Sequence, residues 1–228
     1  MFLGHFAVAL AGKKAAPRAS LGTLVVAAQF LDLLWPALLL AGVEHVRIDP
    51  GNTRMTPLDF YDYPISHSLV MVCLWGAAFG LVYFLARRNG RASLVLGLLV
   101  ASHWVLDLIV HRPDLPLTPG STRYLKLGLW NSMPGTLAVE TGLFLAGIVV
   151  YLKATRSLRW SGTIGFWVFA LVLYAIYLAN VFGPPPPSAA MIAWVGMGQW
   201  LIVLWAWWVD RQRTPAQTPE PAKVIPIA

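Results

Sequence analysis

Long apolar segments, interrupted by short polar stretches, make up most of this chain. Each segment has about the 20 residues that a helix needs to cross the hydrocarbon core of a bilayer. The pattern therefore predicts an all-α fold, a polytopic transmembrane helix bundle of about six spans. The predicted spans are residues 20–42, 65–86, 92–110, 133–152, 161–182 and 189–209.

The two ends of the chain depart from this pattern. Residues 2–11 are apolar but too short to cross a bilayer, and they lack the basic start of a signal peptide. We expect them to form a short re-entrant or interfacial helix. From Thr214 onward the chain is polar and rich in proline, so we expect residues 214–228 to be a disordered cytoplasmic tail. Residues 1–213 then form a single transmembrane domain.

The composition agrees with a membrane protein and excludes other classes. Of the 228 residues, 57% are hydrophobic and 12% are charged, which leaves no room for a large water-soluble domain. The net charge of +7 comes from short basic clusters between the apolar segments, so we expect the lipid bilayer as a partner and no nucleic acid. Cys73 is the one cysteine, which excludes a disulfide or a cysteine metal cluster within the chain.

The lysines and arginines divide unequally between the two sides of the predicted bundle. Cytoplasmic loops hold the excess of these residues in membrane proteins. The smaller set lies in loops 43–64 and 111–132, which we therefore expect to be extracytoplasmic. We expect the chain to be a bacterial inner-membrane protein with its C-terminus in the cytoplasm. That set is Arg47, Arg54, Arg112, Arg123 and Lys126; the larger set is Lys13, Lys14, Arg18, Arg87, Arg88, Arg91, Lys153, Arg156, Arg159, Arg211, Arg213 and Lys223.

Three carboxylates fall inside the predicted spans, namely Asp32, Asp107 and Glu140. A charged side chain at the bilayer centre costs from about 2.5 kcal/mol upward, so such residues indicate a functional site. Asp107 lies between His103 and His111 at a spacing of i, i+4, i+8, which puts all three on one face of a helix. Neutral imidazole and carboxylate are good ligands for zinc and other divalent ions, and residues one turn apart can chelate.

Two further histidines extend this polar set. His67 follows Pro64 at the outer entrance of the second span, and His5 lies in the short N-terminal helix, at a depth that can match Asp32. Hydrogen bonding between helices explains any one such residue alone. Together they call for a bound cation or bound protons to neutralise the carboxylates. A metal site is the favoured interpretation; a proton or ion pathway and a purely structural polar network are the alternatives.

The order of these residues resembles the YdjM-like family of predicted membrane-bound metal-dependent hydrolases. It is also distantly similar to the ligand order of zinc-dependent phospholipase C. The family motifs are Thr-His, Pro-Asp, Arg-Gly-x-Thr-His-Ser and His-x3-Asp, and the resemblance covers roughly the first 140 residues. Two motifs depart from the family, because Leu31 replaces the proline and Tyr63-Pro64-Ile65-Ser66 replaces Arg-Gly-x-Thr. The matching positions are His5, Asp32, His67, His103 and Asp107.

The resemblance implies a metal-dependent hydrolase as the class of reaction. A bound metal can polarise a phosphoryl or acyl oxygen, which favours a phosphoester or ester as substrate. The depth of the cluster on the extracytoplasmic side favours a lipid-like substrate. The five matching residues are the expected ligands of one or two divalent ions, most simply zinc, with Asp107 also catalytic. Glu140 is the expected general base or an additional ligand, and His111 with Arg112 is expected to bind a substrate phosphate. Residues 1–152 would hold the site and residues 160–210 would be scaffold. A metal-ion or proton transporter and a structural membrane protein remain the rival functions.

Overall fold

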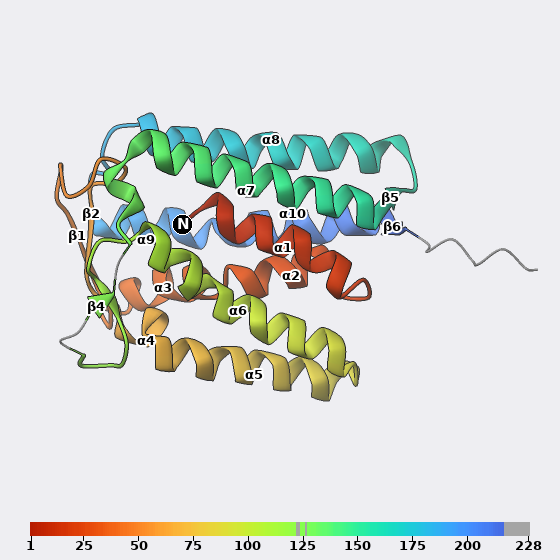
Figure 1. The fold of residues 1–228 in the computed structure, drawn as a ribbon, viewed down its shortest axis with the longest axis horizontal. Coiled ribbons are helices and arrows are strands. Elements are labelled where there is room, and N and C mark those ends of the chain that lie inside the picture. Colours follow the sequence, from red (N-terminus) through yellow and green to blue (C-terminus); the bar gives the residue numbers. More distant parts are fainter. Residues whose placement is uncertain (122–123, 126, 217–228) are drawn as a thin grey trace, which may run out of the picture.

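The apolar segments become long helices that lie side by side in one bundle (Figure 1). The computed structural model describes residues 1–121, 124–125 and 127–216. Within these residues, five helices are long and apolar enough to cross a membrane, and a bent pair of shorter helices adds a sixth candidate. This confirms the all-α, multi-pass bundle. The five are α5 (Leu69–Arg87), α6 (Gly90–Val110), α7 (Met133–Ala154), α8 (Trp160–Phe182) and the segment Ala189–Arg211, which comprises α9 (Ala189–Met197) and α10 (Gln199–Arg211).

The first predicted span is broken rather than continuous. It consists of α2 (Leu21–Ala28) and α3 (Phe30–Leu40), which meet at Gln29 with a bend of 59°. Pro36 lies inside α3 and has no N–H to donate to the carbonyl of Asp32 one turn earlier. The Gln199 side chain donates to that carbonyl instead, at 3.4 Å. The bend matters for the site because it exposes the last carbonyl of α2 in the interior of the bundle.

The short N-terminal helix, α1 (Leu3–Ala15), lies inside the bundle (Figure 1). It packs against α2, α6 and α7 and buries His5, Phe6, Ala9 and Leu10 almost completely. Gly147 of α7 permits the closest approach, since a Cβ there would lie 2.6 Å from the carbonyl oxygen of Ala7. The sequence left open whether this helix re-enters the bundle or lies at its surface, and the structure encloses it.

The connections form two different ends of the bundle. At the loop end are β1 (His45–Ile48) and β2 (Leu58–Asp62), which pair antiparallel with His45 opposite Asp62. The short elements α4 (Pro64–His67), β3 (Leu115–Pro116), β4 (Tyr124–Leu125) and η1 (Leu129–Asn131) complete this end (Figure 1). The opposite, basic end carries the α1–α2 and α5–α6 turns and the strands β5 (Thr155–Ser157) and β6 (Arg213–Pro215).

The strand β6 corrects the expected start of the tail. Thr214 and Pro215 were expected to be disordered, but they pair with Arg156 and Thr155 of β5. Arg213 reinforces this pairing, because its guanidinium donates to the Ser157 hydroxyl at 2.6 Å. The rest of the expected tail, residues 217–228, lies outside the described residues, as do Arg123 and Lys126 of the charge count.

Candidate metal centre

Four elements bring the five expected ligands to one place near the loop end. His5 comes from α1, Asp32 from α3 and His67 from α4, while His103 and Asp107 lie one turn apart on α6. In the described part of the chain, ligand atoms lie within 4.8 Å of one another in two groups. One group is His5, His103 and Asp107, and the other is Asp32, His67 and His103. These groups could hold a metal ion, and His103 belongs to both.

The separations between ligand atoms suit a shared ion. Tetrahedral ligands at about 2.1 Å from zinc lie roughly 3.4 Å from each other. The Nε2 atom of His103 lies 3.2 Å from Asp107 Oδ2 and 3.6 Å from Asp32 Oδ1. His67 Nε2 lies 3.6 Å from Asp32 Oδ1 and 3.9 Å from Asp107 Oδ2, and His5 Nε2 lies 3.1 Å from Asp107 Oδ1. Each separation is close to that of two ligands on one ion.

Burial distinguishes one member of this set. The side chains of His5 and His103 are fully buried, and that of Asp107 is 3% exposed. Asp32 is different, with 26% of its side chain exposed. A small molecule can therefore reach the cluster most directly beside Asp32 on α3, whereas the other ligands are enclosed by helices.

A hydrogen bond to the bent helix pair orients His103. Its Nδ1 donates to the carbonyl oxygen of Ala28 at 2.8 Å. Ala28 is the last residue of α2, where a helix leaves carbonyl groups without intrahelical partners. The proton on Nδ1 leaves a lone pair on Nε2, and this buried Nε2 has no hydrogen-bond partner among the described residues. Histidines that bind metals are usually held in this way by a carbonyl or carboxylate behind them.

A serine and a glutamate orient His67 by the same logic. The Ser66 hydroxyl donates to Glu44 Oε2 at 2.6 Å, so it accepts from His67 Nδ1, also at 2.6 Å. Glu44 accepts from the backbone N–H groups of Ile65 and Ser66 as well. This fixes the short helix α4 and turns the lone pair of His67 Nε2 toward Asp32 and Asp107.

His111, at the end of α6, adjoins the cluster but is not in either group. Its Nδ1 lies 2.9 Å from Asp114 Oδ1, and its Nε2 lies 4.0 Å from Asp107 Oδ2. The ring of Trp130 lies 4.2 Å away, centroid to centroid. Arg112 is held away from the ligand atoms because it contacts Asp59 and Asp114. The two expected substrate-binding residues are thus joined through Asp114 at the edge of the site.

Tyr63 closes the cluster toward the loop end. Its ring lies 4.9 Å from that of His67, and its hydroxyl donates to Asp114 Oδ1 at 3.4 Å. Burial, together with the carboxylates of Asp114 and Asp107, holds the pKa of Tyr63 well above its ordinary value. The hydroxyl therefore stays protonated and acts as a hydrogen-bond donor.

Glu140 lies at the start of α1 rather than among the grouped ligand atoms. It is 1% exposed, and its Oε2 accepts from the backbone N–H of Leu3 at 2.7 Å. The amino group of Met1 contacts Asp107 nearby. A carboxylate at a helix N-terminus satisfies unpaired N–H groups and complements the helix dipole. This placement favours a role in holding α1, and with it His5, over the expected role of general base.

Sequence reasoning missed the residues that orient the histidines. The residue type of Ala28 gives no signal in the sequence, because only its backbone carbonyl oxygen contacts His103. Glu44 is a loop residue distant from His67 in the chain. Two signals were present: Ser66 is adjacent to His67, and Asp114 follows His111 by three residues.

Comparisons with known proteins give no relative to set beside this geometry. No family model, no curated protein and no solved structure matches the chain. The arrangement of the described residues is therefore the basis of the functional proposal below.

Proposed function

We propose that this chain is a membrane-embedded, metal-dependent hydrolase. Its ligands would be His5, Asp32, His67, His103 and Asp107, holding one or two divalent ions, most simply zinc. The observation that carries the proposal is the orientation of the histidines. His67, His103 and His111 each place Nδ1 against an acceptor and turn Nε2 toward the carboxylates. A purely structural network would give those Nε2 atoms hydrogen bonds, yet the buried Nε2 of His103 faces Asp107 and Asp32 without a hydrogen-bond partner among the described residues.

The donor set fits zinc better than a hard cation such as Mg²⁺. Imidazole nitrogen is a good zinc ligand, while Mg²⁺ prefers carboxylates, carbonyls and water. When bound, zinc would lower the pKa of a coordinated water toward neutrality and polarise a phosphoryl or acyl oxygen. Asp32 is the most exposed of the five ligands, so water and substrate would approach the cluster from that side.

The residues of the chain divide the remaining tasks. Asp107 touches both His5 and His103, so it orients the two histidine rings of its own group. His111 and Tyr63 lie at the edge toward the loop end, where Asp114 accepts from both side chains and holds them beside the cluster. Glu140 positions the start of α1 by accepting a hydrogen bond from the backbone N–H of Leu3. The aromatic rings of Phe60 and Trp130 exclude water around His111.

The surroundings of the site favour a lipid-like phosphoester or ester as substrate. The cluster is formed by residues of α1, α3, α4 and α6, and α6 is one of the helices long and apolar enough to cross a membrane. A molecule that dissolves in the bilayer can reach such a depth sideways, whereas a soluble one must cross the loops. The unequal distribution of lysine and arginine supports an extracytoplasmic position for this end of the bundle, in a bacterial inner membrane.

The path toward the basic end argues against the rival transporter function. Between His5 and the basic end, the buried side chains include the apolar Leu10, Leu24 and Leu96, and the buried Lys13 beyond them is paired with Asp210. An ion pathway needs polar groups or water along its whole length. The enzyme function needs only the opening at one end.

The proposal is tested by hydrolysis in detergent or nanodiscs. The purified chain is stripped of metal with a chelator, reloaded with zinc and mixed with a phospholipid or an isoprenoid phosphate, and released phosphate or alcohol is measured. We expect release by the zinc-loaded wild type, and none by the stripped protein or by Asp107→Ala. Zinc-loaded protein that hydrolyses none of these substrates, yet carries zinc across sealed vesicles, would establish the transporter instead.

A further inference from the structure

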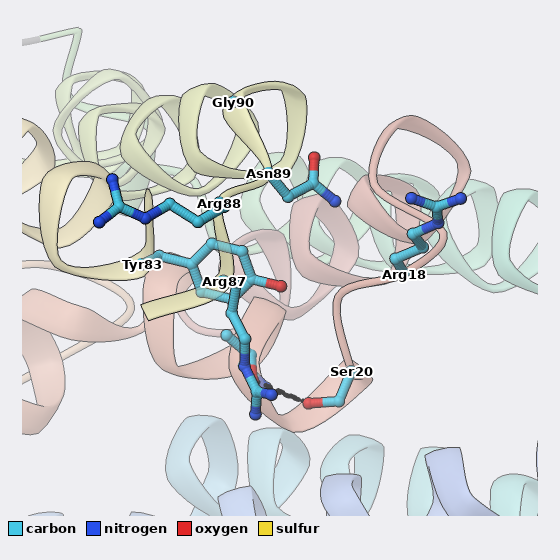
Figure 2. Close-up of a pocket in the computed structure, with 8 residues that line it drawn as sticks. Arg18, Ser20, Tyr83, Arg87, Arg88, Asn89 and Gly90 are labelled. Atoms are coloured by element: carbon cyan, nitrogen blue, oxygen red, sulfur yellow. Dashed lines mark hydrogen bonds between the residues drawn. The ribbon is translucent and has the colours of Figure 1, made fainter. Parts of the chain in front are cut away.

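A basic cavity lies at the opposite end of the bundle from the metal centre. It has a volume of about 550 Å³ and is formed between the α1–α2 turn and the α5–α6 turn. Figure 2 shows Tyr83 and Asn89 extending into the space between the two turns, with Arg18 and Arg87 flanking it. Ser20 and Thr23 line the side formed by α2. The lining thus carries hydroxyl, amide and guanidinium donors and no carboxylate.

The arginines of this cavity lack acidic partners within the described part of the chain. Among the described residues, no carboxylate forms an ion pair with Arg18, Arg87 or Arg88. The aspartate near the end of α10, Asp210, is taken by Lys13 at 2.6 Å. Arginines placed together without acidic partners repel one another, and an anion bound between them removes that repulsion.

The backbone also contributes positive electrostatic potential to the cavity. Helix α2 begins at Leu21 and helix α6 at Gly90, so two helix N-termini with their positive dipole ends adjoin the cavity. The α5–α6 turn begins at Arg88, which adopts φ 50° and donates its N–H to the carbonyl oxygen of Phe84 at 2.7 Å. A non-glycine residue in this left-handed conformation costs about 1 kcal/mol or more.

The cavity opens beside an apolar helix surface. Leu81, Val82 and Leu85 of α5 are 57%, 66% and 55% exposed, directly before the lining residues Arg87 and Arg88. In a bilayer this surface faces acyl chains. A ligand with a phosphate head and an acyl tail would therefore place its head among the arginines and its tail along α5.

We propose that this cavity binds a phosphate group, carried by an anionic phospholipid of the leaflet at the basic end. Arg18 and Arg87 supply charge-assisted hydrogen bonds from two different turns. Tyr83 and Asn89 contribute neutral donors between them. Basic pockets between membrane helices on the cytoplasmic side are suited to such head groups. The site is independent of the metal centre, so either can fail without the other.

The test compares two double variants with the same loss of charge. Arg18→Gln/Arg87→Gln alters the cavity, and Arg91→Gln/Arg159→Gln alters exposed arginines of the same end that do not line it. Each protein is placed in detergent with phosphatidylglycerol, phosphatidylcholine or inorganic phosphate, and bound lipid is counted by native mass spectrometry. We expect wild type and the second variant to retain phosphatidylglycerol over phosphatidylcholine, and the first variant to bind it about 30-fold more weakly.

Three outcomes would overturn the proposal. Equal losses in the two double variants would mean general surface attraction and no built site. Equal retention of phosphatidylcholine and phosphatidylglycerol by wild type would exclude recognition of an anionic head group. Binding of inorganic phosphate alone, lost in Arg18→Gln/Arg87→Gln, would keep the phosphate site and overturn the lipid as its source.

Discussion

Replacing Gly147 by alanine tests whether the position of α1 determines the geometry of the candidate metal centre. The added Cβ would lie 2.6 Å from the carbonyl oxygen of Ala7 and 2.7 Å from its Cα. Ordinary contact begins near 3.4 Å, so the helices must separate by about 0.8 Å, the difference between 3.4 Å and 2.6 Å. Backbone cannot rotate away as a side chain can, and such overpacking typically costs about 1–3 kcal/mol.

This displacement is large for a metal ligand. His5 precedes Ala7 by two residues, about 3 Å along the helix, so it moves with Ala7. Metal–ligand distances tolerate about 0.2 Å. We therefore expect Gly147→Ala to bind zinc at least about tenfold more weakly, as loss of an orienting contact does. The assay is a competitive titration of zinc with a chelating dye on the purified protein.

Gly142 provides the matched control on the same helix. A Cβ there meets nothing within 4 Å, and alanine favours a helix over glycine by about 1 kcal/mol. Gly142→Ala should therefore keep the wild-type zinc affinity and at least its thermal stability. Equal zinc binding by Gly147→Ala and Gly142→Ala would show that the position of His5 does not depend on the fit between α1 and α7.

Three further predictions concern the surroundings of the site. Ser66→Ala should weaken zinc binding about 10–100-fold, because it removes the hydroxyl that links His67 to Glu44. The control Ser68→Ala should bind zinc as the wild type does in the same titration, since the Ser68 hydroxyl has no hydrogen-bond partner among the described residues. Equal zinc binding by the two variants would show that the link is dispensable. Glu140→Gln should keep zinc and turnover, since an amide oxygen still accepts from Leu3, and Glu140→Ala should lose zinc; an inactive Glu140→Gln that retains zinc would instead make Glu140 the base. Reporter fusions after Arg211 and within residues 111–121 should fall on opposite sides of the membrane, and two cytoplasmic signals would place the metal centre on the wrong face.

The sequence predicts the long helices well because apolar length is a local property. The boundaries of α6 and α8 lie within two residues of the predicted spans 92–110 and 161–182. The bend at Gln29 was not predicted, although Pro36 was visible within the first span, because a proline inside a membrane helix is tolerated when neighbours satisfy the freed carbonyl. Here the neighbour is Gln199, from the far end of the chain.

The spacing of residues along one helix predicted part of the site, whereas contacts between different helices could not be predicted from the sequence. The i, i+4 relation of His103 and Asp107 is preserved in space, with 3.2 Å between Nε2 and Oδ2. His5 and Asp32, which were expected at a similar depth, belong to two different ligand groups that share His103. Glu140 was expected at the reaction centre because it is a buried carboxylate, but depth alone cannot distinguish a residue that faces the cluster from one that binds the end of α1. Such assignments need the rotation of each helix, which its neighbours determine.

The metal content of the purified chain is the most direct measurement of whether this cluster is a metal centre. The wild type, His103→Ala and the control Ser68→Ala are purified in detergent without added metal, and bound metals are quantified by inductively coupled plasma mass spectrometry. We predict one or two zinc ions per chain in the wild type and in Ser68→Ala, and loss of zinc in His103→Ala, which removes the ligand shared by both groups. Wild-type protein that folds as a monodisperse species, and neither carries nor takes up stoichiometric zinc or another divalent metal, would contradict the assignment.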